Sequence, residues 1–333
     1  MPPRIYITRA LPEPVWQALD ETGFAYEVYP EDRVIPKDVL LQQVQNRDGI
    51  LCILTDPIDR EVLDAATQVK IIANYAVGYN NIDVDEATRR GIAVTNTPGV
   101  LTDATADLAW TLLFATARKV VASDTYLRQG RFTGWGPMHF LGQDITNRTL
   151  GVVGLGRIGR AFAAKAAGFN MKILYYARRR DAAFEEAYNP GAQWVDLETV
   201  LKNSDFLSIH LPLTPETTHL IGKRELRMMK PNAILINTAR GPIVDEAALA
   251  HALRERWIWG AGLDVYEDEP AVHPDLLGLP NTTLLPHIGS ATTETRTRMG
   301  LMAVENLKAF FTGQRPPNLV NPAMWPPLQN ASG

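Results

Sequence analysis

The sequence has a single cysteine, Cys52, in 333 residues, so it can form no intramolecular disulfide bond. Few cysteines are typical of proteins from a reducing compartment, and we expect a cytoplasmic protein without a signal peptide. Cys52 lies in the apolar run 50–54. This setting predicts a small buried side chain on a strand, and a reactive thiol is the less favoured interpretation.

Long hydrophobic runs and an excess of positive charge are also missing. No apolar run approaches the roughly 18 residues that a membrane-spanning helix needs. The formal net charge is -4, so we expect no surface for nucleic acid or an anionic membrane. The histidines lack the spacing of metal ligands and a cysteine pair is absent, so no metal site is predicted. A globular protein remains, and its 46% of hydrophobic residues can build sizeable cores.

Short apolar runs alternate with helix-like segments, which is typical of parallel sheets with crossover helices. The chain is long enough for two such α/β units. In the first unit we predict helices at about 12–21, 37–45 and 59–67, and strands at 4–8, 24–29, 49–54, 70–74 and 92–95. The second unit begins at Thr149, and its further strands are predicted near 172–177, 206–211, 233–237, 260–264 and 283–285. A last helix is predicted at about 292–312.

One long helix is predicted between the two units, from about Thr102 to Gly130, because apolar residues recur there at three- and four-residue spacing. It is longer than one crossover needs, so we expect it to bridge domains or to pack against a second subunit. Trp135, shortly after it, has two interpretations. It covers the mouth of a substrate site, from its own or a partner subunit, or it is an aromatic residue in an interface loop.

A glycine motif opens the second unit. Gly154, Gly156 and Gly159 form G-x-G-x-x-G, with Arg157 and Ile158 between the last two glycines. An apolar strand precedes the motif and a helix-like segment follows it, which is the context of a dinucleotide site. The glycines permit a tight turn, close approach of a pyrophosphate and helix–strand packing, while the helix N-terminus binds the anion. The alternative is a glycine-rich turn without a ligand.

The residues after the next strand bear on the choice of cofactor. An NAD site usually has an acid there for the ribose hydroxyl, but this strand ends at Ala177 and is followed by Arg178, Arg179 and Arg180. Guanidinium groups bind a 2'-phosphate, so we predict that NADP(H) is preferred and that NAD(H) is possible. Two alternatives remain: the arginines form a solvated turn, or Asp181 binds the ribose.

Three polar side chains follow three successive strands of the second unit: Arg240, Glu269 and His287. Carboxyl ends of parallel strands share one edge, where ligands bind in open α/β sheets. A keto acid reductase needs a cation for the substrate and an acid that protonates the forming alkoxide. Arginine suits the first role, and a histidine kept charged by a carboxylate suits the second. His210 also ends a strand, but we interpret it as structural or cofactor-adjacent.

Together, these motifs resemble the D-isomer-specific 2-hydroxyacid dehydrogenase family, and within it the glyoxylate/hydroxypyruvate reductases. The resemblance extends over nearly the whole chain and is carried by segments 75–79, 95–102, 154–159, 237–241 and 286–292. It implies reduction of glyoxylate to glycolate and of hydroxypyruvate to D-glycerate, with His287 as proton donor, Glu269 as its partner and Arg240 as substrate ligand. Asn80 departs from the aspartate that many relatives have, which bears on substrate preference.

The resemblance also implies the remaining contacts. Backbone N–H groups around Val77 and Gly78 would bind the substrate carboxylate. Asp264 would face the nicotinamide carboxamide, and the loop of Thr238 and Ala239 would lie under the nicotinamide. Arg240, His287 and Gly289 complete the expected cofactor contacts.

For the fold, the resemblance implies two doubly wound parallel-sheet domains, with a Rossmann coenzyme domain inserted into a flavodoxin-like substrate domain. Residues 1–98 and 290–333 would form the substrate-binding domain, and residues 99–289 the dinucleotide-binding domain. The long helix near 102–130 would lie in a homodimer interface.

Other functions are compatible with the same motifs. One is a different oxidation in this family, such as that of phosphite, formate or 3-phosphoglycerate, although the 75–78 loop has no Lys or Arg for a phosphite oxyanion. Another is an NAD(H)-sensing scaffold related to corepressors, against which the arginines at 178–180 argue. A catalytically retired binding module would be expected to lack one of the three catalytic side chains.

Overall fold

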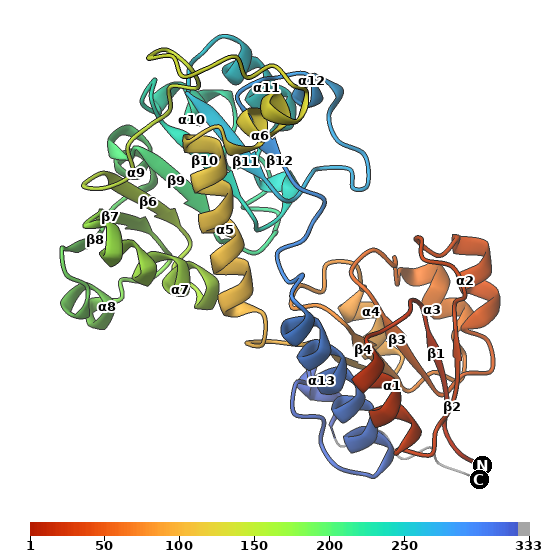
Figure 1. The fold of residues 1–333 in the computed structure, drawn as a ribbon. Coiled ribbons are helices and arrows are strands. Elements are labelled where there is room, and N and C mark those ends of the chain that lie inside the picture. The colour runs from red at the N-terminus through yellow and green to blue at the C-terminus, as the bar shows by residue number, and fades with distance from the viewer. Residues whose placement is uncertain (326–333) are drawn as a thin grey trace. The chain divides into compact units, whose positions relative to one another are not determined.

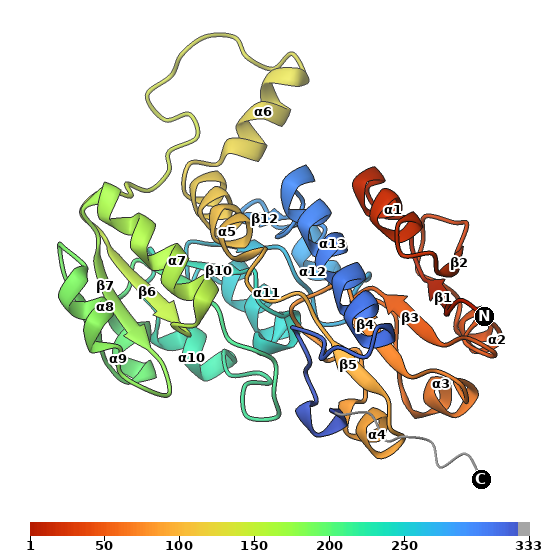
Figure 2. The same cartoon turned by 90° about the horizontal axis from the view of Figure 1, so that it is seen from below.

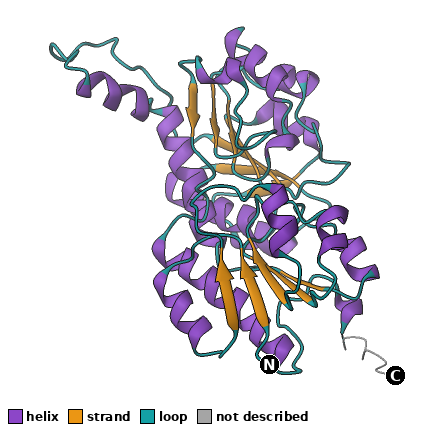
Figure 3. Cartoon of the chain, turned by 90° about the vertical axis from the view of Figure 1, so that its right-hand side faces the viewer, coloured by secondary structure: helices purple, strands orange, loops and turns teal. Residues whose placement is uncertain are grey.

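The computed structural model describes residues 1–325. The chain divides into two units, and each contains one parallel sheet with helices on its faces (Figures 1 and 3). We call Met1–Leu101 with Ser290–Gly333 the terminal unit and Thr102–Gly289 the inserted unit. The predicted fold class of two parallel-sheet α/β domains is confirmed. No helix of the described part is both long and apolar enough to cross a bilayer. Residues 326–333, which end the expected substrate domain, lie outside it.

The terminal unit has five parallel strands in the order β2-β1-β3-β4-β5, a flavodoxin-like order. The strands are β1 (Arg4–Ile7), β2 (Ala25–Val28), β3 (Gly49–Cys52), β4 (Ile71–Asn74) and β5 (Ala93–Thr95). Helices α1 (Glu13–Asp20) and α13 (Thr293–Phe311) pack together on one face. The other face is covered by α2 (Lys37–Gln43), α3 (Arg60–Ala65) and α4 (Val84–Arg89). The positions of the predicted strands are confirmed.

Central strands β3 and β4 are buried along their whole length, because helices cover both faces of the sheet. This explains why the sequences of β3 and β4 are continuous apolar runs and do not alternate between apolar and polar residues. Cys52 ends β3 with no exposed surface, and burial raises the pKa of its thiol well above the ordinary value. The prediction of a buried, unreactive cysteine is therefore confirmed for the folded protein.

The inserted unit has seven parallel strands in the order β12-β11-β10-β9-β6-β7-β8. They are β6 (Thr149–Val153), β7 (Lys172–Tyr176), β8 (Ala192–Trp194), β9 (Phe206–Ile209), β10 (Ile234–Asn237), β11 (Gly260–Leu263) and β12 (Thr282–Leu284). The strand order reverses between β6 and β9, and ligands of open α/β sheets bind at the carboxyl ends beside such a reversal. Strand β8 was not predicted; it is an edge strand with two exposed residues, so it lacks an apolar run.

Eight α-helices of the inserted unit connect and cover these strands. They are α5 (Thr102–Ala117), α6 (Val120–Arg128), α7 (Arg157–Lys165), α8 (Ala182–Ala187), α9 (Leu197–Asn203), α10 (Lys223–Met228), α11 (Glu246–Arg254) and α12 (Pro274–Leu277). Short 3₁₀ turns occur at Ala166–Phe169 and Gly241–Ile243, and at Pro322–Met324 in the terminal unit. Apolar cores lie on both faces of the sheet. They hold the strands in place, and with them the loops that carry the site residues.

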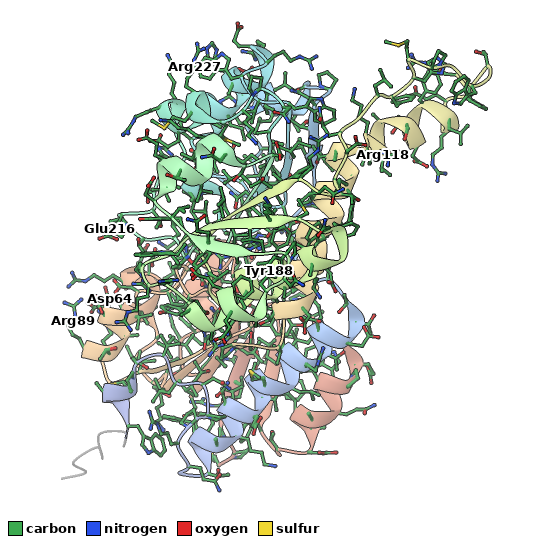
Figure 4. All side chains as sticks on the ribbon, turned by 90° about the vertical axis from the view of Figure 1, so that its left-hand side faces the viewer. Asp64, Arg89, Arg118, Tyr188, Glu216 and Arg227 are labelled. Carbon is green, nitrogen blue, oxygen red and sulfur yellow. The ribbon has the colours of Figure 1, made fainter. Side chains whose placement is uncertain are left out.

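The prediction of one helix from about Thr102 to Gly130 is wrong. The stretch forms two helices, and Figure 4 labels Arg118 between them. The helix breaks because Lys119 adopts a left-handed conformation with φ of 53°. Helix α5 packs against β10, β11 and α7 within its own unit. Helix α6 has no buried residue, and with the following loop it extends away from the sheet of the inserted unit (Figure 2). We call residues 118–145 the arm.

Candidate active site

The predicted site residues of the inserted unit lie in loops that follow parallel strands. The glycine motif follows β6, and residues 238–240 follow β10. Asp264 and Glu269 follow β11, and His287 follows β12. Because all these strands are parallel, the loops lie at one edge of the sheet. The described residues include no cluster of His, Cys, Asp and Glu that could hold a metal ion.

Steric contacts explain two of the three motif glycines. Gly154 has φ of 100°, and a Cβ there would lie 2.7 Å from the carbonyl oxygen of His210. A Cβ on Gly159 would lie 2.0 Å from the carbonyl oxygen of Gly154. A Cβ on Gly156 would instead meet no heavy atom within 4 Å. Glycine is a favoured residue before a helix, and no protein atom crowds position 156, so the space there is open to a ligand that approaches the backbone.

Helix α7 begins directly after Gly156, and no side chain caps its N-terminus. Its first turn contains Arg157 and Ile158 and has no acidic residue. The N–H groups of this turn and the positive end of the helix dipole favour an anion. The open position at Gly156 and this helix end therefore fit the pyrophosphate of a dinucleotide.

The three arginines after β7 differ in their contacts. Arg180 forms an ion pair with Glu185, with 2.7 Å between Nη2 and Oε2. Arg178 and Arg179 are exposed, and no described residue forms a hydrogen bond or ion pair with either. Asp181 caps α8 by accepting from the Phe184 N–H at 3.0 Å, and it also pairs with Arg160. Two guanidinium groups are thus available to a ligand, while the Asp181 carboxylate already has partners.

His287 and Glu269 form a hydrogen-bonded pair, with 2.8 Å between Nδ1 and Oε2. The other oxygen of Glu269 accepts the Tyr266 N–H at 3.0 Å. Burial alone would raise the pKa of Glu269, but its bonds with His287 and Tyr266 lower that pKa below the ordinary value. Glu269 is therefore ionised at neutral pH and stabilises the protonated imidazole. With Nδ1 engaged, Nε2 is the ring nitrogen that remains for a substrate.

Asp264 fixes the loop that carries His287. Its carboxylate is buried and accepts the N–H groups of Ile288 at 2.7 Å and Gly289 at 2.8 Å. Burial raises the pKa of Asp264 to about 6. The backbone of His287 has φ of 53°, a conformation that costs on the order of 1–3 kcal/mol. The two bonds from Asp264 hold the following residues and so maintain this conformation.

Arg240 lies in a loop that is shaped by Asn237 and Gly241. The Asn237 side chain donates to the Arg240 carbonyl at 2.9 Å and accepts the Ala239 N–H at 3.0 Å. A Cβ on Gly241 would lie 1.8 Å from the carbonyl carbon of Tyr266, so the Arg240 and Glu269 loops pack backbone to backbone. Burial lowers the pKa of Arg240 and the charge of Glu269 opposes this, and the guanidinium remains charged.

Sequence analysis missed the supporting roles of three of these residues. Asn237 and Gly241 lie within a recognised motif, but only their contacts show what they do. Tyr266 has no sequence signal, since it acts through its backbone N–H. His210 has its Nε2 2.9 Å from the Ser208 hydroxyl, and burial lowers the pKa of His210 to about 3. His210 is therefore neutral and does not compete with His287 as an acid.

Val77 and Gly78, the expected ligands of a carboxylate, follow β4 in the terminal unit. Both are half-buried, and no described residue accepts a hydrogen bond from either backbone N–H. Two adjacent free N–H groups can bind an anion. The terminal unit therefore offers an anion-binding loop of its own.

Comparison with known proteins identifies the family. Residues 110–289 match the model of the D-isomer specific 2-hydroxyacid dehydrogenase NAD binding domain. The chain is 53% identical to a glyoxylate reductase of Thermococcus litoralis over 96% of this chain and 97% of the relative. It belongs to the D-isomer specific 2-hydroxyacid dehydrogenases. The resemblance seen in the sequence is thereby confirmed, and the protein is an NAD(P)-dependent dehydrogenase.

Solved structures that are similar to this chain agree with the fold. The TT0316 protein of Thermus thermophilus has 45% identity and a TM-score of 0.89, covering 95% of this chain and 99% of that one. An NADPH-dependent glyoxylate/hydroxypyruvate reductase of Sinorhizobium meliloti, in complex with NADP and malonate, has 35% identity and a TM-score of 0.84. That likeness covers 97% of this chain and 98% of the other.

Replacing Gly156 by Ala tests whether a ligand explains this glycine. The added methyl group meets no protein atom, so we expect the melting temperature of the free protein to change little. The Kd for the dinucleotide should rise about tenfold or more, because the methyl group occupies the approach of the pyrophosphate. Calorimetric titration and thermal unfolding measure the two effects separately.

Gly168→Ala is the matched control for this substitution. A Cβ on Gly168 also meets open space, but this glycine lies outside the motif, so both quantities should stay unchanged. Gly159→Ala should lower the melting temperature, because its Cβ collides with the Gly154 carbonyl. Undiminished dinucleotide affinity in Gly156→Ala would contradict the assignment of the site.

Proposed function

We propose that this dehydrogenase reduces glyoxylate to glycolate and hydroxypyruvate to D-glycerate. The observation that carries the proposal is the 2.8 Å contact between His287 and Glu269 at the strand edge that also holds Arg240. This set provides an acid, its charged partner and a cation, which is what reduction of a keto acid requires. The names of relatives at 50–53% identity support the choice of substrate.

In this reaction His287 holds the proton that the substrate oxygen receives. When bound, the dinucleotide supplies the hydride that goes to the carbonyl carbon. Nε2–H of the imidazolium then donates to the carbonyl oxygen, so the product carries one new C–H and one new O–H bond. Glu269 holds Nδ1 of the imidazole and so orients the ring, and Arg240 binds and polarises the substrate. The backbone N–H groups of Val77 and Gly78 bind its carboxylate.

We propose the dinucleotide contacts on the same basis. The turn of Gly154, Gly156 and Gly159 with the start of α7 would bind the pyrophosphate, and the loop of Thr238, Ala239 and Arg240 would lie under the nicotinamide. Asp264, His287 and Gly289 would complete this side of the cofactor site. Asp264 already accepts two backbone N–H groups, and its oxygens can accept a further bond from the carboxamide.

The preferred dinucleotide in this proposal is NADP(H), with NAD(H) as a possible second cofactor. Arg178 and Arg179 have no partner among residues 1–325 and can bind a 2'-phosphate, whereas Arg180 is held by Glu185. Asp181, the alternative ligand of the ribose, is engaged with Arg160 and Phe184. A related structure that contains NADP supports the same choice.

We further propose a homodimer that forms through the arm. Apolar side chains gather on α6 and the loop after it: Val120, Val121, Leu127, Phe132, Trp135, Met138 and Leu141 are all exposed. A group of exposed apolar side chains of this size marks an interaction surface, and a second copy of the chain offers the same surface in return. Trp135 lies within this surface and is 85% exposed in the single chain.

The other partners and the location follow from composition and burial. We propose a cytoplasmic enzyme whose small-molecule partners are its dinucleotide and a 2-keto or 2-hydroxy acid. The buried thiol of Cys52 suits a reducing compartment. A net charge of -4 gives no support to binding of nucleic acid or a membrane surface.

His287→Ala should abolish most of the turnover, because the transition state loses its proton donor. We expect kcat to fall about a hundredfold or more with an unchanged Kd for the dinucleotide. Glu269→Gln is the companion variant, since glutamine keeps the size but loses the charge. Its kcat should also fall, because the imidazole loses the charged partner that holds its Nδ1. Equal kcat in wild type and His287→Ala would refute the assignment.

Replacing Arg178 and Arg179 together by Ala tests cofactor preference. We expect the KM for NADPH to rise roughly tenfold or more while the KM for NADH stays close to wild type, because only NADPH has a 2'-phosphate. Arg180→Ala is the matched control, since this side chain is paired with Glu185 and should matter less. An equal rise in KM for NADPH and NADH would show that the arginines do not bind the 2'-phosphate.

Charged substitutions on the arm test the homodimer. Leu127→Glu combined with Phe132→Glu places two carboxylates on the proposed interface, and sedimentation should then show monomers where the wild type shows dimers. Leu277→Glu is the control, because Leu277 is 66% exposed on α12, away from the arm in sequence. A wild-type monomer at micromolar concentration would exclude the proposed assembly.

A further inference from the structure

Three consecutive carbonyl groups in the loop after β4 are each held by one hydrogen bond. The Ala76 carbonyl accepts the Thr97 N–H at 2.9 Å. The Val77 carbonyl accepts from the Asn96 side chain at 2.8 Å, and the Gly78 carbonyl accepts from the Asn74 side chain at 2.8 Å. Side chains therefore supply two of the three donors, although the loop forms no regular secondary structure.

Peptide planarity links these carbonyls to the N–H groups that are proposed to bind the substrate. In a trans peptide the N–H of one residue points opposite to the carbonyl of the residue before it. The N–H of Val77 therefore points away from Thr97, and the N–H of Gly78 points away from Asn96. Because Asn96 and Thr97 are neighbours, both N–H groups turn away from the same segment. Neither finds a partner among the described residues.

The two asparagines are themselves firmly placed. Asn74 ends β4 and is only 1% exposed, and its side-chain oxygen lies 3.6 Å from the Cys52 sulfur, which donates to it. Asn96 follows β5, and its backbone is bound to α13 and to the segment after it: the Asn306 side chain donates to its carbonyl, and its N–H donates to the Asn318 carbonyl. Rigid elements of the sheet and the last helix thus fix the direction of the loop peptides.

We propose that Asn74 and Asn96 are positioning residues for recognition of the substrate carboxylate. They do not touch the substrate. Asn96 holds the Val77 carbonyl and thereby the Gly78 N–H of the same peptide, while Asn74 holds the Gly78 carbonyl and so anchors the following peptide of the loop. Preorganised donors avoid the cost of ordering the loop when the substrate binds. The inference rests on the proposed reduction of a keto acid, and it adds the residues that make the backbone loop a carboxylate site.

Asn96→Ala and Asn74→Ala test the inference in the full-length enzyme. We expect the KM for glyoxylate to rise about tenfold in Asn96→Ala, and the inhibition constant of oxamate, an unreactive carboxylate, to rise in parallel. The value of kcat at saturation and the Kd for NADPH should stay within about twofold of wild type, because proton donor and dinucleotide site are untouched. Asn74→Ala should act in the same direction, provided that it folds; Asn96 is less buried and carries the test if it does not.

Asn321→Ala is the matched control. Asn321 is buried in the same unit and forms three side-chain bonds, to the Val94 N–H, the Thr88 hydroxyl and the Ile92 carbonyl, but it does not contact the loop. The Asn321→Ala substitution should lower the melting temperature and leave the KM for glyoxylate and the inhibition constant of oxamate unchanged. If Asn96→Ala shifts only the melting temperature, as this control does, the inference is overturned. A wild type that binds NADPH but reduces no keto acid would instead overturn the proposed function.

Discussion

The strained loop that carries His287 is the constraint on which the catalytic edge depends. Its backbone lies in a left-handed conformation that a histidine adopts at a cost on the order of 1–3 kcal/mol. Two carboxylates offset this cost: Asp264 binds the next two N–H groups, and Glu269 binds the imidazole itself. Hydrogen bonds to charged groups contribute about 1.5–3 kcal/mol each, so the loop is stable as long as both acids remain in place.

Both proposed anion sites of this protein offer backbone N–H groups. In the inserted unit, the start of α7 offers N–H groups beside a glycine that leaves open space. In the terminal unit, the loop of Val77 and Gly78 offers two more, and the Thr97 N–H and the Asn96 side chain hold the carbonyls that set their direction. Arginines add what backbone groups lack, namely full charge for a carboxylate and for a phosphate. In the proposed sites, backbone geometry sets the position of each anion and guanidinium groups add affinity.

Much of the fold, and the positions of the three proposed catalytic residues at strand ends, could be predicted because their signals are local. Apolar runs mark buried parallel strands, and a polar residue just after such a run lies at the edge where ligands bind. The two-unit α/β architecture followed from this pattern, whereas the insertion of one unit into the other came only from the resemblance. Each of these sequence patterns involves only a few neighbouring residues.

The predictions that failed depend on contacts between distant residues. Apolar spacing continues past Lys119, so nothing in the sequence marks the break between α5 and α6. Strand β8 forms through its pairing with β7 and is not marked by a run of apolar residues. The ion pair that distinguishes Arg180 from Arg178 and Arg179, and the bonds from Asn74 and Asn96, join side chains to partners that the sequence does not show to be close.

Turnover by the wild-type enzyme is the most direct test of this account. Loss of NADPH absorbance would be followed with glyoxylate, hydroxypyruvate and pyruvate, and the products would be identified by chiral chromatography. We expect rapid turnover with the first two acids, yielding glycolate and D-glycerate. Tight binding of the dinucleotide without turnover of any keto acid would contradict the account and would indicate a dinucleotide sensor built on a dehydrogenase fold.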